Sequence, residues 1–419
     1  MMPSNDLPDN FKETEIGPIP VDWEVVRLGD VASLTMGQSP PSSTYNTDGE
    51  GFPFLQGKAE FGETYPTPVK WCSQPKKIGD RGSVLISVRA PVGDVNVARD
   101  NYCIGRGLAA INGSESLDNW FLFYLLIFAK RRLEDRGTGS TFKSINKGVL
   151  QNFSLSLPPL PEQRRIAHVL STIQRAIAAQ GDLIAAAREV KRSLMQRLFT
   201  YGPGPEPAPT KETEIGEIPE HWEVVRLGEV AEKPQYGYTA SASDHPVGPK
   251  FLRITDIQDS GVFWPSVPYC EIDERGLLKY SLEAGDLLFA RIGATTGKTY
   301  LVTECPESVF ASYLMRVRVQ PQKILPEYAH YFTNTEAYWR QINASKGGRL
   351  KQGINIPVLT SLLLSLSPLS EQREIIHILS AIDRKIETEE QHKAALQALF
   401  QSMLHQLMTG QVRVKEVDL

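Results

Sequence analysis

The chain contains two blocks of its own sequence twice, and this duplication constrains its fold more than any other feature. Residues 12–32 return as residues 211–231, with 17 of 21 positions identical. A second block, residues 159–173, returns as residues 368–382. Because chance does not produce two such repeats, the sequence predicts a duplicated scaffold.

The stretches between the repeated blocks differ from each other, and we call them module 1 (residues 33–153) and module 2 (residues 232–361). They share little identity. Both mix strand-like apolar runs with a stretch of helical length, and Gly and Pro interrupt the remainder. The sequence therefore predicts an α+β fold in which one scaffold, used twice, holds two related but diverged modules.

A heptad pattern follows each copy of the second block. Starting at Ile166 and at Ile375, ten positions advance in alternating steps of four and three, and eight of the ten are apolar in each run. This period, sustained over about five heptads, is typical of a coiled coil. Two such seams, separated by a Pro-rich linker at 201–209 and a module, predict an antiparallel pair with pseudo-two-fold symmetry.

The alternative is two independent helices that each pack on their own domain. Polar residues interrupt both seams and can fix the register of a coiled coil, as buried polar positions commonly do. These residues are Gln180, Lys191, Glu389 and Lys393.

Composition excludes several classes of protein. The net charge of −4 and the 41% of apolar residues argue against a histone-like binder and against wholesale disorder. The four cysteines form no Cys-x-x-Cys pair, so neither a zinc ribbon nor a disulfide scaffold is expected. The first ten residues do not resemble a signal peptide, and no apolar run is long enough for a membrane span. A cytoplasmic protein is the expectation.

The charge is divided between the parts of the chain. Module 1 holds 14 Lys and Arg against 11 Asp and Glu, and module 2 holds 14 against 13. Segments 1–31 and 201–231 each hold 2 basic against 7 acidic residues. The modules thus suit a phosphate-bearing partner, and the acidic repeated segments are candidate protein-docking surfaces.

Motifs that suggest catalysis fail on inspection. Gly293–Thr299 resembles a P-loop but has three residues instead of four between its glycines. Ser39-Pro-Pro-Ser42 resembles an aminomethyltransferase signature but lacks the aromatic residue that stacks on a flipped base. The repeated His168 and His377 have no nearby ligand partners. We therefore expect a binding protein with no catalytic residues, no metal site and no cofactor of its own.

Three stretches carry a family resemblance. They are the segment Glu15–Asp30 with its copy from Glu214, the run Pro-Leu-Pro-Glu-Gln-Arg-Arg-Ile-Ala at 159–167, and the C-terminal Leu407–Val414. Together they closely resemble the specificity (S) subunits of type I restriction–modification systems, and the resemblance covers essentially the whole chain.

The resemblance implies a non-catalytic subunit with two target recognition domains. Each domain reads one half of a bipartite, asymmetric site in double-stranded DNA, and the paired helices set the gap between the halves. Two modification (M) subunits dock on the scaffold and methylate adenine with S-adenosylmethionine. Two restriction (R) subunits, where a system has them, add ATP-driven translocation and cleavage. These cofactors belong to the partner subunits.

The resemblance also suggests domain boundaries. Residues 1–153 form the first repeated segment and target recognition domain, and residues 154–200 the first coiled-coil helix. Residues 201–361 form the linker, the second repeated segment and the second domain, and residues 362–419 the second helix and the tail.

Specificity is expected from polar side chains on module loops that reach base edges, with Lys and Arg positioning the phosphates, and basic residues of the modules are the named candidate DNA contacts. Structural salt bridging is the alternative role for Arg89 and Arg291, and the alternative function is a coiled-coil adaptor that spaces two protein-binding modules. The candidates in module 1 are Arg89, Arg106, Lys143 and Lys147, and those in module 2 are Arg291, Lys346, Arg349 and Lys351.

Overall fold

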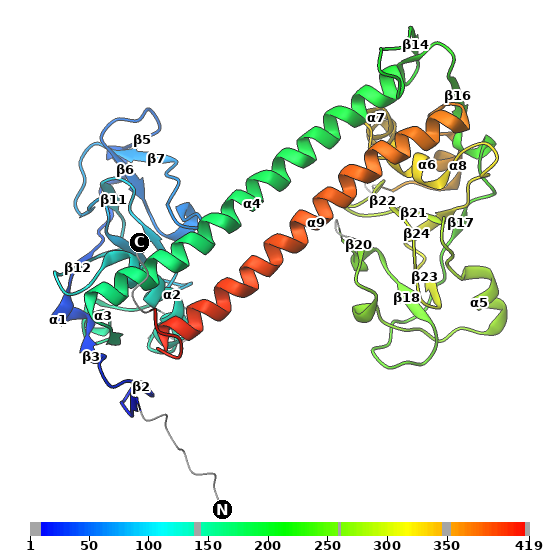
Figure 1. Ribbon diagram of the computed structural model, residues 1–419. Coiled ribbons are helices and arrows are strands. Elements are labelled where there is room, and N and C mark those ends of the chain that lie inside the picture. Colours follow the sequence, from blue (N-terminus) through cyan, green and yellow to red (C-terminus); the bar gives the residue numbers. More distant parts are fainter. Residues whose placement is uncertain (1–9, 138–143, 259–260, 346–352, 415–419) are drawn as a thin grey trace, which may run out of the picture. The chain divides into compact units, whose positions relative to one another are not determined.

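The computed structural model describes residues 10–137, 144–258, 261–345 and 353–414, which form two compact units. Unit 1 comprises residues up to Gly181 together with those from Gln391, and unit 2 comprises Asp182–Glu390. The long helices α4 (Leu160–Tyr201) and α9 (Leu369–Met408) each contribute one half to each unit (Figure 1). Each unit therefore holds one module and a pair of helix halves.

The helix halves run antiparallel within each unit. In unit 1 the start of α4 lies beside the end of α9, where Arg165 Nε donates to the Val414 carbonyl at 2.9 Å. In unit 2 Lys191 of α4 pairs with Asp383 of α9 at 2.6 Å. All twenty predicted seam positions are buried or half-buried. The prediction of an antiparallel pair is confirmed in each unit, although the helices also pack on the modules as the alternative required.

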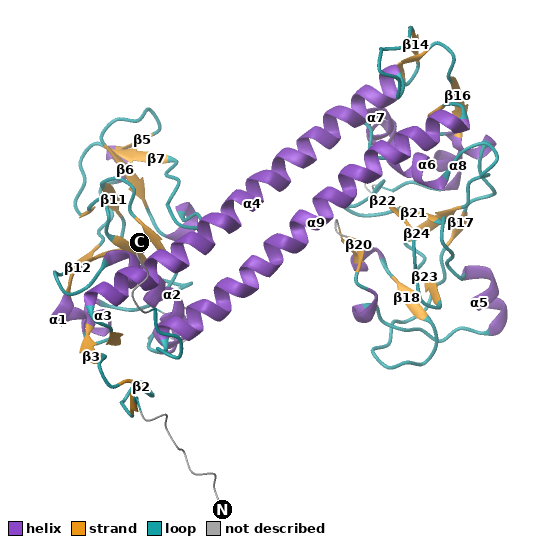
Figure 2. Cartoon of the chain, in the orientation of Figure 1, coloured by secondary structure: helices purple, strands orange, loops and turns teal. Residues whose placement is uncertain are grey.

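Module 1 of unit 1 contains two larger sheets and the helix α2 (Asn119–Asp135), which lie beside the helix halves (Figure 2). One sheet has the strand order β10-β9-β12-β4, and the other has the order β5-β7-β6-β11-β8. Helix α2 contributes Phe121, Phe123 and Tyr124, all fully buried, to the core that it shares with α4 and α9. The strands are β4 (Ala32–Met36), β5 (Tyr45–Asn46), β6 (Phe52–Leu55), β7 (Lys70–Cys72), β8 (Ile78–Gly79), β9 (Val84–Ser87), β10 (Val95–Val97), β11 (Tyr102–Ile104) and β12 (Leu108–Gly113).

Unit 2 repeats this plan with shorter elements. Its main sheet has the order β17-β24-β21-β22, and β18 pairs in parallel with β23 as β6 does with β11. The strands are β17 (Gln235–Tyr236), β18 (Lys250–Leu252), β19 (Ile257–Gln258), β20 (Gly261–Val262), β21 (Leu287–Ala290), β22 (Thr299–Leu301), β23 (Ser308–Phe310) and β24 (Leu314–Val317). The helices of this module are α5 (Glu274–Tyr280), α6 (Pro326–Phe332), α7 (Glu336–Ser345) and α8 (Ile356–Ser361).

The repeated blocks form the same small elements in both units. In unit 1, β1 pairs with β2, and β3 pairs with β13 just before α4 begins. In unit 2, β14 pairs with β15, and β16 pairs with β25 just before α9 begins. The bounds are β1 (Phe11–Lys12), β2 (Ile19–Pro20), β3 (Glu24–Arg27), α1 (Leu28–Val31), α3 (Lys147–Gln151), β13 (Ser154–Leu157), β14 (Thr210–Thr213), β15 (Gly216–Pro219), β16 (Glu223–Arg226) and β25 (Leu363–Leu366).

A glutamine in the first turn of each long helix joins the helix to its module. Gln163 and Gln372 are fully buried. The side-chain carbonyl of each accepts a hydrogen bond from a backbone N–H at the start of a module helix, that of Asp118 at 2.9 Å and that of Leu325 at 2.8 Å. Each amide nitrogen also donates to two backbone carbonyls at 2.8 to 3.0 Å. The repeated Glu-Gln pair is therefore structural.

The glutamate beside each glutamine holds the tryptophan of the repeated N-terminal segment. Trp23 Nε1 donates to Glu162 at 3.1 Å, and Trp222 Nε1 donates to Glu371 at 2.9 Å. Both indoles are fully buried. The repeated segments are thereby fixed to the starts of α4 and α9.

The two carboxylates find different further partners. In unit 1 the guanidinium of Arg413 bonds both oxygens of Glu162, at 2.6 and 2.8 Å, and both oxygens of Asp22, at 2.9 and 2.6 Å. This contact lowers the pKa of the Asp22 carboxyl. In unit 2, His221 occupies the position of Asp22 and bonds the matching glutamate directly at 2.8 Å. His221 is thus a direct partner of the unit 2 glutamate, whereas Asp22 is joined to Glu162 through Arg413.

Replacing Arg413 by Ala should destabilise unit 1 by about 2 kcal/mol, because the buried Glu162 loses the one cation that it pairs with among the described residues. Urea unfolding followed by tryptophan fluorescence measures this loss. Arg188→Ala is the control, since Arg188 forms a largely exposed pair with Glu390 and should cost less than about 0.5 kcal/mol. Equal losses of stability in the two variants would contradict the role of Arg413 as the partner of Glu162.

Candidate nucleic-acid interface

Each module contains a pair of parallel strands whose carboxyl ends meet a group of loops. In module 1 the pair is β6 and β11, and in module 2 it is β18 and β23. Three further loops reach the same place in each module. We call these loops the carboxyl-end clusters, which comprise Gly37–Ser39, Gln56, Val88–Arg89, Gly105–Gly107 and Ser144–Lys147 in module 1 and Gly237–Thr239, Arg253, Arg291–Ile292, Ala311–Tyr313 and Gly353–Asn355 in module 2.

The two clusters share one backbone frame. Six backbone hydrogen bonds of module 1 have direct counterparts in module 2, all between 2.8 and 3.1 Å. The bonds in module 1 run from Gly37 to Leu108, Gln38 to Ile104, Val88 to Gly107, Gly105 to Leu55, Leu108 to Gly105 and Ile145 to Val88. Their counterparts run from Gly237 to Leu314, Tyr238 to Phe310, Arg291 to Tyr313, Ala311 to Leu252, Leu314 to Ala311 and Ile354 to Arg291.

The frame brings together three of the basic residues predicted for module 1. Arg89 and Arg106 are exposed and lie on adjoining loops, since Val88 bonds to Gly107. Arg89 also forms a β-bridge with Ser144, three residues before the exposed Lys147 at the start of α3. Their side chains form no hydrogen bond or ion pair with the described part of the chain, which leaves them available to a ligand.

Arg291 of module 2 is held by the protein. Its guanidinium lies 4.6 Å from the ring centre of Tyr236, and Nη1 donates to the Ser312 carbonyl at 3.3 Å. It aligns with Val88 in the shared frame. These two contacts, neither of them the salt bridge considered as the alternative, hold Arg291, and its role at DNA stays a prediction. The remaining candidates, Lys143, Lys346, Arg349 and Lys351, lie outside the residues that the structure describes.

The residues named from the sequence are all cations, and the structure adds uncharged side chains in the clusters and directly beside them. Gln38 and Gln56 are exposed in module 1, and Tyr236 and Tyr313 are exposed in module 2. Ser39, from the rejected methyltransferase-like motif, accepts from the Arg106 backbone at 3.3 Å. A sequence signal existed, since Gly37 and Gly237 both follow the first module strand of their unit, but it is visible only once the frames are aligned.

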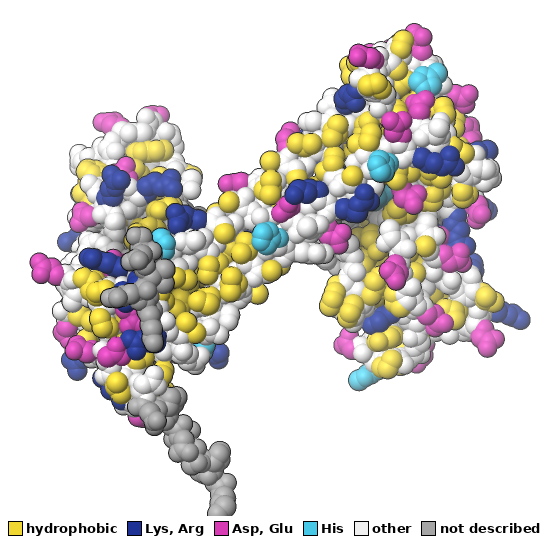
Figure 3. Space-filling view, in the orientation of Figure 1, with side chains coloured by type: hydrophobic (Ala, Val, Ile, Leu, Met, Phe, Trp, Pro, Cys, Tyr) yellow, Lys and Arg dark blue, Asp and Glu magenta, His cyan; other side chains and the backbone are white. Residues whose placement is uncertain are grey.

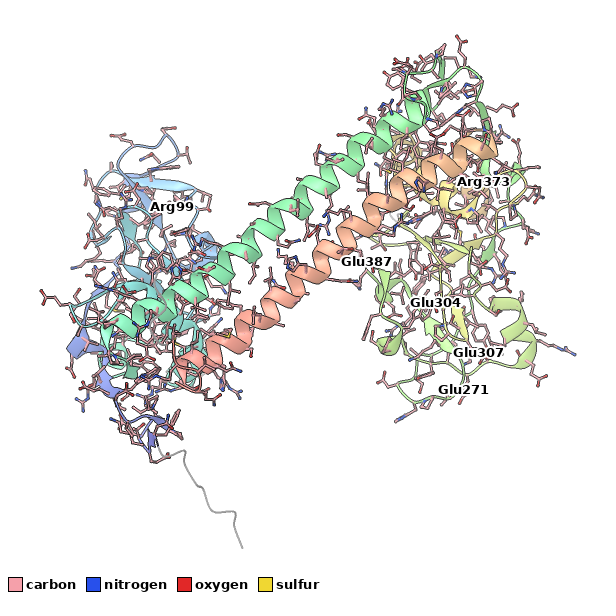
Figure 4. The ribbon with its side chains drawn as sticks, in the orientation of Figure 1. Arg99, Glu271, Glu304, Glu307, Arg373 and Glu387 are labelled. Atoms are coloured by element: carbon pink, nitrogen blue, oxygen red, sulfur yellow. The ribbon has the colours of Figure 1, made fainter. Side chains whose placement is uncertain are left out.

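Acidic residues lie at the opposite ends of the same strands. In module 2, Glu271 and Glu307 lie by the starts of β18 and β23, and Figure 4 shows them with Glu304 on one lobe. In module 1, Glu50 and Asp100 precede β6 and β11. Figure 3 shows Lys and Arg side chains gathered on one face of unit 1 near β6 and β11. In module 1 the exposed cations Arg89, Arg106 and Lys147 make the carboxyl-end cluster a surface that suits a polyanion.

The rejected motifs take other forms in the structure. Gly293–Thr299 forms the connection between the antiparallel strands β21 and β22, whereas a P-loop leads from a strand into a helix. His168 and His377 are exposed on α4 and α9. Among the described residues no group of three His, Cys, Asp or Glu is placed to hold a metal ion. In that same part of the chain, every helix is too short or too polar to cross a bilayer.

Comparison with known proteins matches both copies of the duplicated sequence to one family. The family model described as the type I restriction modification DNA specificity domain matches residues 20–187 and 219–398. The MjaVIII specificity subunit of Methanocaldococcus jannaschii, a type I restriction enzyme subunit, is 27% identical over 418 residues, which cover 98% of this chain and 97% of that one. The putative MjaX specificity subunit of the same organism is 50% identical over 194 residues, a match that spans 46% of each chain.

A solved structure gives the same fold. The S subunit of a type I restriction–modification system from M. genitalium aligns with this chain over 100% of both chains, with a TM-score of 0.60 and 13% identity. The duplicated modules on paired helices are the architecture of a specificity subunit, the non-catalytic component of a restriction–modification complex. The chain belongs to the type I restriction–modification DNA specificity family.

Unit 2 also contains a pocket of about 1140 Å³ beside α6, and its wall carries a titratable group that unit 1 lacks. His330 lies there with Nδ1 3.4 Å from Thr299 Oγ1. Burial, reinforced by the nearby Lys191 and opposed by Asp383, lowers the pKa of His330 to about 4. The equivalent residue of unit 1 is the buried Phe123, since the next residue in each unit, Tyr124 or Tyr331, donates to equivalent positions of α4 or α9.

Unit 2 should therefore lose stability as the pH falls from 6.5 towards 4. Over that interval the unfolded imidazole binds a proton that the folded one does not, which costs up to about 3 kcal/mol. Unfolding free energies measured at several pH values report this slope. His330→Phe, which introduces the residue of unit 1, should flatten it, and an unchanged slope in that variant would contradict the assignment to His330.

Proposed function

We propose that this chain is the DNA-reading specificity subunit of a type I restriction–modification complex, in which module 1 and module 2 each read one half of a bipartite, asymmetric site. The observation that carries the proposal is the shared frame of the carboxyl-end clusters. The same backbone hydrogen bonds recur in both clusters, while the side chains presented differ at nearly every position.

Such an arrangement suits sequence readout. Base edges in the major groove are distinguished by the donors, acceptors and apolar groups that face them, so a new half-site requires new side chains on an unchanged frame. Exposed Lys and Arg around the module 1 cluster, such as Arg89 and Lys147, supply phosphate contacts that fix the position of that module. Two unlike clusters in one chain give an asymmetric site.

The alternative, an adaptor that binds proteins through its modules, makes a different use of the same charges. A DNA reader that neutralises several phosphates loses affinity steeply with added salt, whereas a protein adaptor has no affinity for duplex DNA to lose. Binding of a labelled random duplex to the chain with its modification subunits, measured between 50 and 200 mM salt, therefore separates the two readings.

Exchanging module 1 for that of another family member should change one half of the methylated site only. The backbone hydrogen bonds that shape each cluster run within one module, so module 2 should keep its own base preference. Methylome sequencing of cells that express the hybrid with the modification partner measures both halves. A change in both halves, or in neither, would sink the proposal.

Two modification subunits, and restriction subunits through them, dock on the repeated scaffold in this proposal. Its support is the acidic surface that recurs in both repeated segments. Four acidic positions are exposed in both copies, and they are Glu13, Glu15, Glu24 and Asp30 in unit 1 and Glu212, Glu214, Glu223 and Glu229 in unit 2. Two equivalent surfaces fit two equivalent partners.

Reversing charge on one copy should halve the number of docked partners. Glu13→Lys with Glu24→Lys should reduce the ratio of modification subunits from two to one per chain, since the second surface is intact. Analytical ultracentrifugation of the reconstituted complex measures this ratio. Glu271→Lys with Glu307→Lys, on module 2, is the control and should leave two subunits bound.

A further inference from the structure

One turn of the carboxyl-end cluster presents unlike side chains in the two modules. In module 1 it is Gly105-Arg106-Gly107, between β11 and β12, and in module 2 it is Ala311-Ser312-Tyr313, between β23 and β24. The equivalence follows from the shared hydrogen bonds, in which Gly105 matches Ala311 and Gly107 matches Tyr313. A ligand that contacts this turn therefore faces different side chains in the two modules.

In module 1 the turn isolates Arg106. A Cβ at Gly105 would lie 3.0 Å from the Gln56 carbonyl oxygen, and one at Gly107 would lie 2.7 Å from it, so the flanking positions pack tightly against the neighbouring loop. Ser39 Oγ accepts from the Arg106 backbone N–H at 3.3 Å. The guanidinium of Arg106 is exposed and has no acidic partner within the described residues. The turn therefore presents one unpaired, planar cation.

In module 2 the turn presents an aromatic ring. Tyr313 replaces the second glycine and is 54% exposed. Its backbone carbonyl accepts from Arg291 at 3.0 Å, which holds the turn in the same frame. The two arginines nearest to this turn are both engaged, Arg291 by Tyr236 and Ser312, and Arg253 by a bidentate contact with Asp256 at 3.0 and 2.8 Å. The exposed ring, not a cation, is the distinguishing group.

We infer that Arg106 selects a guanine in the half-site of module 1, and that Tyr313 selects a thymine, through its methyl group, in the half-site of module 2. An unpaired guanidinium matches the paired acceptors O6 and N7 of guanine in the major groove, and an apolar ring edge contacts the C5-methyl group of thymine. This inference rests on the proposed function and assigns one base pair of each half-site to a named residue.

The test uses the chain assembled with its modification subunits and a library of randomised duplex DNA, from which bound molecules are selected and sequenced. The wild-type complex should select a bipartite motif with a guanine in one half and a thymine in the other. Arg106→Ala should reduce the preference at that guanine by about 10-fold to 100-fold and leave the other half unchanged. Tyr313→Ala should do the same for the thymine, and Tyr313→Phe should retain it.

Each other outcome has a defined meaning. Selection of no bipartite motif by the wild type would refute the proposed function itself. A motif that Arg106→Ala binds more weakly but with unchanged preferences would overturn the inference, because Arg106 then contacts a phosphate. If Arg106→Ala abolishes the base preferences in both half-sites, the variant Arg106→Lys distinguishes the explanations. Its compact ammonium group should keep a reduced guanine preference only if residue 106 reads that base. Loss of the thymine preference in Tyr313→Phe would overturn the second assignment. Arg188→Ala, which removes an arginine of α4 that is paired with Glu390 and lies outside both clusters, is the matched control and should change neither half.

Discussion

The buried amide at the start of each long helix is the interaction on which the rest of the structure depends. Gln163 and Gln372 each accept one backbone N–H and donate to two carbonyls, and only a side-chain amide supplies an acceptor and two donors at once. A glutamate there would be unable to donate, and an apolar residue would leave three buried backbone groups unpaired. Each module is thereby anchored to its helix at a fixed place.

Duplication gave the chain two copies of this anchor, and the glutamate beside each glutamine has different partners in the two copies. Arg413 of the C-terminal tail forms ion pairs with both Glu162 and Asp22, whereas Glu371 is bonded by His221, which occupies the position of Asp22. A buried carboxylate tolerates either solution because each supplies donors to it. The core of unit 1 differs from that of unit 2 at another position, where Phe123 stands in place of His330.

The sequence predicted what depends on period and repetition, and missed what depends on alignment in space. The heptads starting at Ile166 and Ile375 announced the paired helices, and the repeats announced two modules of one plan. The strand-like apolar runs include the buried strands β9 and β21, but the two-residue strands and the parallel pairing could not be predicted, because so short a strand has no readable period. Of the candidate contacts, Arg106 could be chosen for its charge, but Tyr313 could not, because its exposure is set by a turn whose partner in module 1 has no recognisable sequence similarity.

The shared frame explains how two surfaces with unlike side chains can belong to one stable fold. The bonds that shape the clusters run between backbone groups, and backbone donors and acceptors are present whatever the side chain. A substitution at Gln38, Arg106 or Tyr313 therefore alters what the surface presents without removing a bond that shapes it. By contrast, Gln163 and Trp23 act through their side chains, and their surroundings recur nearly unchanged in both units. The division between repeated and diverged sequence follows this division between side-chain and backbone bonding.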